Sequence, residues 1–330
     1  MQIANTPFLQ STSKYRASIM GIAILSIMLF HQYFTSIFPF NFFHNFGYWG
    51  VDVFLFLSGM GLVNSLEKYN VCTFYKRRFF RIIPVCILCG TAKYSVFLFL
   101  GTSVASLKEE LNIGLWSIAS LDLWFIHTII ILYAISPILY FLLKKRPVVT
   151  LVSIILISLI NSFTLLPQVG YDWLSPSGVT AWTLRRLPVF AWGIFIAIKK
   201  VFDNRHFCIS ISFLIVAISL IIISKVCEIK FSVFYCESLI LAFGIPALIL
   251  LTIYILQRMP SSIMSFLQLC GKHSLELYLV HEFIFYVLMT NYKNHNPWLL
   301  LAVGFLLALI LACLSKIAIT KIMESISSWH

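Results

Sequence analysis

Ten apolar segments follow one another along this chain, each of about the length needed to cross a lipid bilayer. They are residues 17–36, 48–65, 80–100, 121–143, 148–166, 182–198, 208–225, 236–256, 273–290 and 297–316. A membrane helix needs roughly 20 apolar residues, and in lipid only helices or closed barrels satisfy their backbone hydrogen bonds. The pattern therefore predicts an all-α polytopic membrane bundle of about ten transmembrane helices.

The composition also indicates lipid as the main solvent of the chain. Hydrophobic residues make up 60% of the 330 residues and charged residues only 11%, whereas a soluble domain has roughly 25% charged residues. The net charge of +12 comes from cations that lie between the apolar segments, where they set topology and contact anionic lipid headgroups. Nucleic acid is therefore not an expected partner. We expect one membrane domain over residues 1–330, without an appended soluble domain.

The positions of the cations predict the orientation of the helices. With ten spans and a cytoplasmic N-terminus, 17 of the 24 Lys and Arg residues fall on the cytoplasmic side. Cytoplasmic loops carry such an excess of positive charge. The predicted topology has both termini inside, in the inner (plasma) membrane of the cell.

Cysteine usage gives no sign of a metal site. Cys86 and Cys89 form a Cys-x-x-Cys pair, but it lies in an apolar run without a nearby His or further Cys. Small core residues are the better interpretation.

A histidine and an aspartate are expected at similar depth on the first two helices. His31 ends the apolar run that begins at Ala17, and Asp52 lies near the outer end of the second segment. Ionisable groups at this depth usually have a functional role, and an aspartate can orient an imidazole as a general base. The pair predicts His31 as the base and Asp52 as its orienting partner. A histidine hydrogen-bonded near the headgroups is the plainer interpretation of His31.

Small residues follow Asp52 on the same helix. Gly59 returns to about the face of Asp52 after seven residues, and Ser58 adjoins it. Such a surface suits either close helix packing or a slim ligand, and both interpretations stay open.

Cations cluster at the start of the third apolar segment. Lys76, Arg77, Arg78 and Arg81 occupy four of six positions there. Arg78 and Arg81, three residues apart, can point to one side of a helix, and paired guanidiniums at a helix start favour phosphate. Anchoring to lipid headgroups is the alternative.

Other polar residues lie inside later segments, where we expect them to contribute to substrate binding. Ionisable side chains at such positions often line a cavity. The candidates are Asp122, Trp124 and His127 in the fourth segment, Arg186 in the sixth, and His281 and Glu282 in the ninth.

Taken together, these residues resemble the acyltransferase-3 family, the integral membrane O-acyltransferases of bacterial surface glycans. The resemblance covers Phe30-His31, the sequence Gly-Val-Asp-Val-Phe-Leu-Phe-Leu-Ser-Gly at 50–59 and Phe-Tyr-Lys-Arg-Arg-Phe-Phe-Arg-Ile-Ile-Pro at 74–84. It continues more weakly through residues 123–125, 186–193 and 274–281.

The resemblance implies transfer of an acyl group from cytoplasmic acyl-CoA, such as acetyl-CoA, to a hydroxyl of a glycan or lipid-linked saccharide. It implies His31 as the catalytic histidine and an Arg-x-x-Arg motif at Arg78 and Arg81 that binds the CoA phosphates. The family commonly has a basic residue eleven positions before this histidine, where Met20 stands here. Arg16, one turn earlier, is expected to substitute in part as a contact for the CoA cofactor.

Other mechanisms and functions stay open at this point. A covalent acyl-histidine is the alternative to direct transfer. A transporter or flippase for a lipid-linked glycan, with proton coupling through His281 and Glu282, is the main alternative function. A structural membrane subunit is a third, but it leaves the placed ionisable residues unexplained.

Overall fold

The chain is built of α-helices wherever the structure describes it. The structure is a computed structural model. It describes residues 7–32, 46–99, 124–170, 175–200, 202–226, 232–292 and 294–327, and these ranges contain no strand. Nine helices within them are long and apolar enough to cross a membrane. The predicted all-α polytopic membrane bundle is confirmed.

Helix α13 (Ser274–Tyr292) is the expected span that is not among these nine. Its 19 residues are enough to cross a bilayer. Its polar residues Glu276, His281 and Glu282 interrupt the apolar run. The count of ten spans, and with it the placement of both termini inside, stays a prediction.

Contacts divide the chain into two compact units. Unit 1 comprises residues 1–19, 51–76 and 124–264, and unit 2 comprises residues 20–50, 77–123 and 265–330. The boundary falls within four continuous helices, α1 (Pro7–Phe30), α3 (Trp49–Lys68), α4 (Val71–Phe99) and α12 (Ser261–Lys272). Each unit therefore combines stretches that lie far apart in the sequence.

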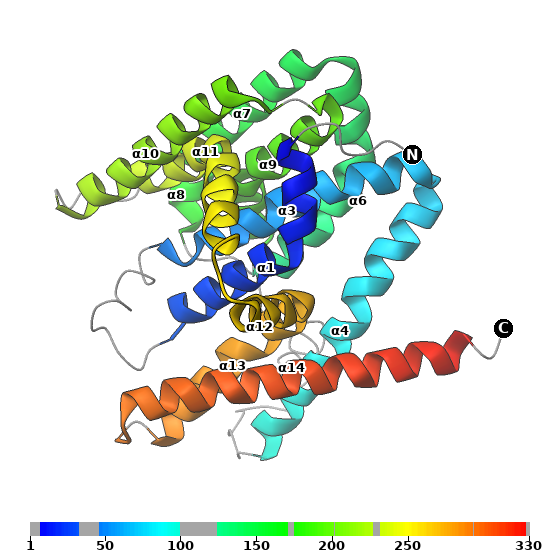
Figure 1. Ribbon diagram of the computed structural model, residues 1–330, viewed down its shortest axis with the longest axis vertical. Coiled ribbons are helices and arrows are strands. Elements are labelled where there is room, and N and C mark those ends of the chain that lie inside the picture. The colour runs from blue at the N-terminus through cyan, green and yellow to red at the C-terminus, as the bar shows by residue number, and fades with distance from the viewer. Residues whose placement is uncertain are drawn as a thin grey trace. The chain divides into compact units, whose positions relative to one another are not determined.

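Helix α9 (Pro176–Lys199) forms the core of unit 1 and is buried over most of its surface. It packs against α6 (Trp124–Lys145), α7 (Pro147–Phe163) and α11 (Ser232–Leu256). Helix α10 (Asn204–Val226) lies along α11 (Figure 1). The short helix α8 (Leu165–Val169) packs beside α7 and α9.

Two glycines bring α3 and α9 into close contact. A Cβ atom at Gly59 would clash with the carbonyl oxygen of Phe190, and one at Gly193 would clash with that of Phe56. Small residues allow the backbones of membrane helices to approach in this way. Of the two interpretations of Gly59, the contact supports helix packing.

Helix α9 begins earlier than the sequence predicted, at Pro176 rather than near residue 182. Ser175 caps it, because its Oγ accepts a hydrogen bond of 3.1 Å from the N–H of Gly178. Proline at the first helical position completes a strong start signal.

Unit 2 contains helices α13 and α14 (Pro297–Ser327), which follow each other in the chain and pack against each other. They are coloured orange to red in Figure 1. Gly304 of α14 allows this contact, because a Cβ there would press on the ring of Phe285. The second half of α1 also belongs to this unit. There Gly50 lies against the carbonyl oxygen of Ala23.

Candidate functional site

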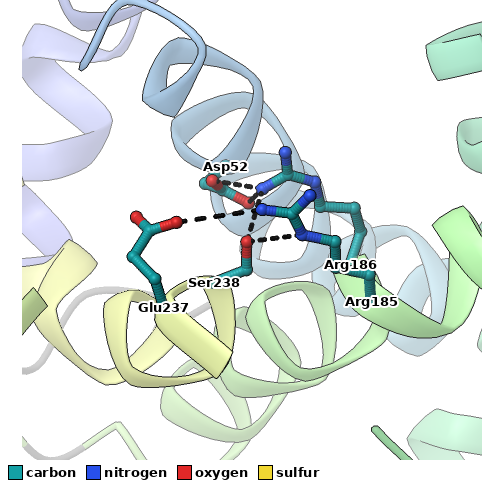
Figure 2. A network of polar contacts seen from close by, with 5 residues as sticks. All are labelled: Asp52, Arg185, Arg186, Glu237 and Ser238. Atoms are coloured by element: carbon teal, nitrogen blue, oxygen red, sulfur yellow. Dashed lines mark hydrogen bonds and ion pairs between the residues drawn. The ribbon is translucent and has the colours of Figure 1, made fainter. Parts of the chain in front are cut away.

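A buried network of charged residues joins three helices of unit 1 (Figure 2). Nη1 of Arg186 on α9 donates to both carboxylate oxygens of Asp52 on α3, with a distance of 2.6 Å to Oδ1. Nε of Arg185 donates to Oγ of Ser238 on α11 at 2.8 Å. Nη2 of Arg185 lies 3.8 Å from Oε2 of Glu237.

The network is balanced in charge and closed to solvent. Two guanidiniums face two carboxylates, and none of these four residues exposes more than 2% of its surface. Buried charges persist only when they are paired with opposite charges, as they are here. Asp52 is therefore held as the counter-ion of Arg186.

Two tryptophans lie against the arginines. The guanidinium carbon of Arg185 lies 5.1 Å from the ring centre of Trp182, and that of Arg186 lies 5.4 Å from the ring centre of Trp124. The two indole rings are 5.5 Å apart. Cation–π contacts of this kind are strongest where water is excluded.

His31 belongs to unit 2 and has a second histidine as its partner. The residue follows the last residue of α1, and its N–H still donates to the carbonyl of Ile27 at 3.1 Å. Its Nδ1 lies 2.9 Å from Nε2 of His281 on α13. His281 is fully buried, whereas His31 is partly exposed.

The expected pairing of His31 with Asp52 joins residues of the two units, so it stays a prediction. Within its own unit each side chain has a different partner, His281 for His31 and Arg186 for Asp52. Sequence reasoning singled out all four residues and proposed neither of these pairs.

The arginine pair of unit 2 lies well inside helix α4. The helix begins at Val71, and the side chain of Asn70 accepts from the N–H of Thr73 at its start. Arg78 is partly exposed and Arg81 is exposed. The expectation that they mark a helix N-terminus is wrong, because α4 starts about two turns earlier. An anion bound here would be held by side-chain cations, without the free N–H groups of a helix N-terminus.

Arg16 contacts helix α3 within unit 1. Its Nη1 donates to the carbonyl oxygen of Leu57 at 2.9 Å. Its guanidinium also covers Gly61, where a Cβ would lie 3.2 Å from Nη2. Arg16 therefore serves helix packing in unit 1, beside the cofactor role expected from the sequence. Ser58, one residue beyond Leu57, is partly exposed.

The remaining predicted residues are spread over both units. Trp124 lies against Arg186 of the network, His127 is buried on α6 with 9% of its surface exposed, and Glu282 is partly exposed on α13. Asp122 lies outside the described residues. No group of three or more His, Cys, Asp or Glu residues that could hold a metal occurs in the described part of the chain.

Sequence reasoning assigned no role to three members of the network, Arg185, Glu237 and Ser238. A signal for Glu237 was present, because it is a carboxylate inside the apolar segment 236–256 and an acid in lipid needs a partner. Ser238 carried no such signal, since serine is common in membrane helices.

Comparison with known proteins gives one match. A family model of an acyltransferase domain matches residues 19–316, which include the network of unit 1 and both histidines of unit 2. Neither any curated protein nor any solved structure matches the chain significantly.

Proposed function

We propose, from the premise that this chain belongs to the acyltransferase-3 family, that it is an O-acyltransferase of the inner membrane acting on a surface or exported glycan. Family membership and the apolar helices establish a multi-pass membrane acyltransferase. The donor, the acceptor and the residue roles below are the proposal. We treat residues 1–330 as one acyltransferase domain.

The proposed reaction moves an acyl group, acetyl in its simplest form, from cytoplasmic acyl-CoA to a glycan hydroxyl. The hydroxyl oxygen attacks the thioester carbonyl, a C–O bond forms and the C–S bond breaks. The hydroxyl proton passes to His31 and then to the departing CoA thiolate. General base catalysis of this kind contributes about 10² to 10⁴-fold in rate.

One observation carries the assignment of His31. Its ring is held by a second imidazole at 2.9 Å, and the residue as a whole is only partly buried. A general base needs both a partner that fixes its orientation and a nitrogen that can reach the reacting hydroxyl. No other histidine named from the sequence combines the two, since His281 is buried.

Arg78 and Arg81 supply the chemistry that CoA phosphates require. Guanidiniums bind phosphate through charge-assisted hydrogen bonds. Arg81 is exposed and Arg78 partly exposed on the same helix, which supports their role as contacts for a ligand at the surface.

The tryptophan side of the network is our proposed region for the acceptor glycan. Indole rings offer the flat apolar faces on which sugar rings stack, and Trp124 lies beside Arg186. Nε of Arg186 is buried without a hydrogen-bond partner among the described residues. An acceptor oxygen would satisfy this donor, whose isolation is otherwise costly. In this arrangement Asp52 holds Arg186 in place.

Release of the CoA thiol tests the proposal. Membranes containing the protein are incubated with radiolabelled acetyl-CoA and envelope polysaccharide from the producing cells, and free thiol and labelled glycan are measured. We expect both to appear with the wild type and neither with His31→Ala, which should reach the membrane in normal amount. A transporter would release no thiol, and normal transfer by His31→Ala would remove the central assignment.

A further inference from the structure

We propose that His281 is a positioning residue that holds His31 in one tautomer, with the hydrogen on Nδ1 and the lone pair on Nε2. The inference rests on the proposed function, because the tautomer matters only if His31 takes a proton from the acceptor. It gives His281 a different part from the substrate contact expected from the sequence. Three contacts within unit 2 support it.

The hydrogen on His281 is placed by backbone carbonyls. Nδ1 of His281 lies 3.0 Å from the carbonyl oxygen of Leu277 and 2.9 Å from that of Tyr278, both in the preceding turn of α13. Carbonyl oxygens only accept hydrogen bonds. Nδ1 of His281 therefore carries a hydrogen and donates it to this pair of oxygens.

The other nitrogen of His281 then determines the tautomer of His31. A neutral imidazole with its hydrogen on Nδ1 has a lone pair on Nε2. Nε2 of His281 lies 2.9 Å from Nδ1 of His31, a distance that requires one hydrogen between them. Only His31 can supply it, so Nε2 of His31 keeps its lone pair.

The surroundings of His281 favour the neutral form on which this reasoning depends. The residue is fully buried, and burial disfavours a charged imidazole. Its ring lies edge-on to Phe285, with centroids 6.0 Å apart, and 5.8 Å from the ring of Tyr278. Aromatic packing thus fixes the ring that in turn fixes His31.

We call this chain of hydrogen bonds, from the main-chain carbonyls through His281 to His31, the relay. It orients His31 as the aspartate carboxylate orients the catalytic histidine of a serine hydrolase. When Nε2 of His31 takes the hydroxyl proton, its Nδ1–H stays bonded to His281. The proton then leaves from Nε2 to the thiolate, and the starting tautomer is restored. His281 touches neither donor nor acceptor.

Two substitutions of similar size separate the relay from simple packing. In His281→Gln the amide oxygen can still accept a hydrogen bond from Nδ1 of His31. In His281→Leu the side chain has no hydrogen-bond acceptor. We expect His281→Leu to lower kcat by about 100-fold or more and His281→Gln to stay within about tenfold of wild type. The KM for acetyl-CoA should change less than about twofold in both, because His281 binds no substrate.

The full-length variants are assayed by CoA thiol release, with His295→Gln, an exposed loop histidine, as the matched control that keeps wild-type activity. Equal losses in the two His281 variants, or wild-type kcat in His281→Leu, would overturn the relay. Absence of thiol release from the wild type would instead overturn the proposed function.

The tautomer itself can be read without any activity. Solid-state NMR of the wild-type protein carrying ¹⁵N-labelled histidine distinguishes a protonated from an unprotonated ring nitrogen, and His31→Gln assigns the signal of His31. We expect Nδ1 of His31 to be protonated and Nε2 to be unprotonated. The reverse tautomer would refute the relay even if every His281 variant failed to accumulate.

Discussion

Breaking the ion pair between Asp52 and Arg186 should destabilise the protein far more than removing the pair altogether. Asp52→Asn leaves two buried guanidiniums, those of Arg185 and Arg186, facing the single carboxylate of Glu237. Unit charges about 4 Å apart attract by about 4 kcal/mol at an effective dielectric constant near 20. Removing one partner of a buried pair costs about 3–5 kcal/mol, because the other charge stays buried.

Arg186→Met should cost a similar amount, because it leaves Asp52 without its hydrogen-bond donor. The double variant Asp52→Asn with Arg186→Met removes both charges and keeps similar volumes. It should therefore be more stable than the sum of the single losses implies, with a coupling of about 3 kcal/mol.

Unfolding in mixed micelles titrated with SDS measures the free energies of all four proteins. If the two losses are additive, with a coupling below about 0.5 kcal/mol, the contact between the two residues does not stabilise the protein. Thiol release by the same variants adds a second readout. If the double variant regains stability without activity, the pair also serves the reaction.

Three further predictions concern helix packing, cofactor binding and helix capping. Gly59→Ala should destabilise by about 1–3 kcal/mol in the SDS titration, because its Cβ meets backbone, whereas Gly61→Ala should cost less, because its Cβ meets only a movable side chain. Arg78→Ala should raise the KM for acetyl-CoA about tenfold, and Arg77→Ala, outside the Arg-x-x-Arg motif, should change it little; equal effects would indicate headgroup anchoring. Ser175→Ala should lower stability by about 1 kcal/mol through loss of the α9 cap.

The helical architecture was predictable because lipid leaves so few alternatives. Apolar segments of the right length must be helices or barrel strands, and these segments are too long for strands. The ends were less predictable, since polar flanking turns continue the helices. Helix α4 begins at Val71 rather than near residue 80, and α9 at Pro176 rather than near 182. In both cases local signals, Asn70 as a cap and the Ser175-Pro176 pair, marked the true start.

The polar residues were predictable one by one, but their partners were not. A charged or imidazole side chain in an apolar segment needs a partner, which is why Asp52, Arg186, His31 and His281 stand out. Asp52 and Arg186 are 134 residues apart and His31 and His281 are 250 apart. Such distant pairs depend on which helices pack together, and apolarity alone does not tell one lipid-solvated helix from another.

Spacing along the helices nevertheless offered one clue to the pairing. On α3 a glycine, Gly59, follows Asp52 by seven residues, and on α9 another, Gly193, follows Arg186 by seven. Seven residues are two turns, so each helix presents its charged residue and its glycine on one face. The glycines mark where the two backbones meet. On both helices the ion-paired residue comes first and the glycine contact follows, so the two helices run in the same direction. Two segments that carry opposite charges at the same offset from a glycine are therefore candidates for a parallel pair, because close packing at the glycines brings the charges together.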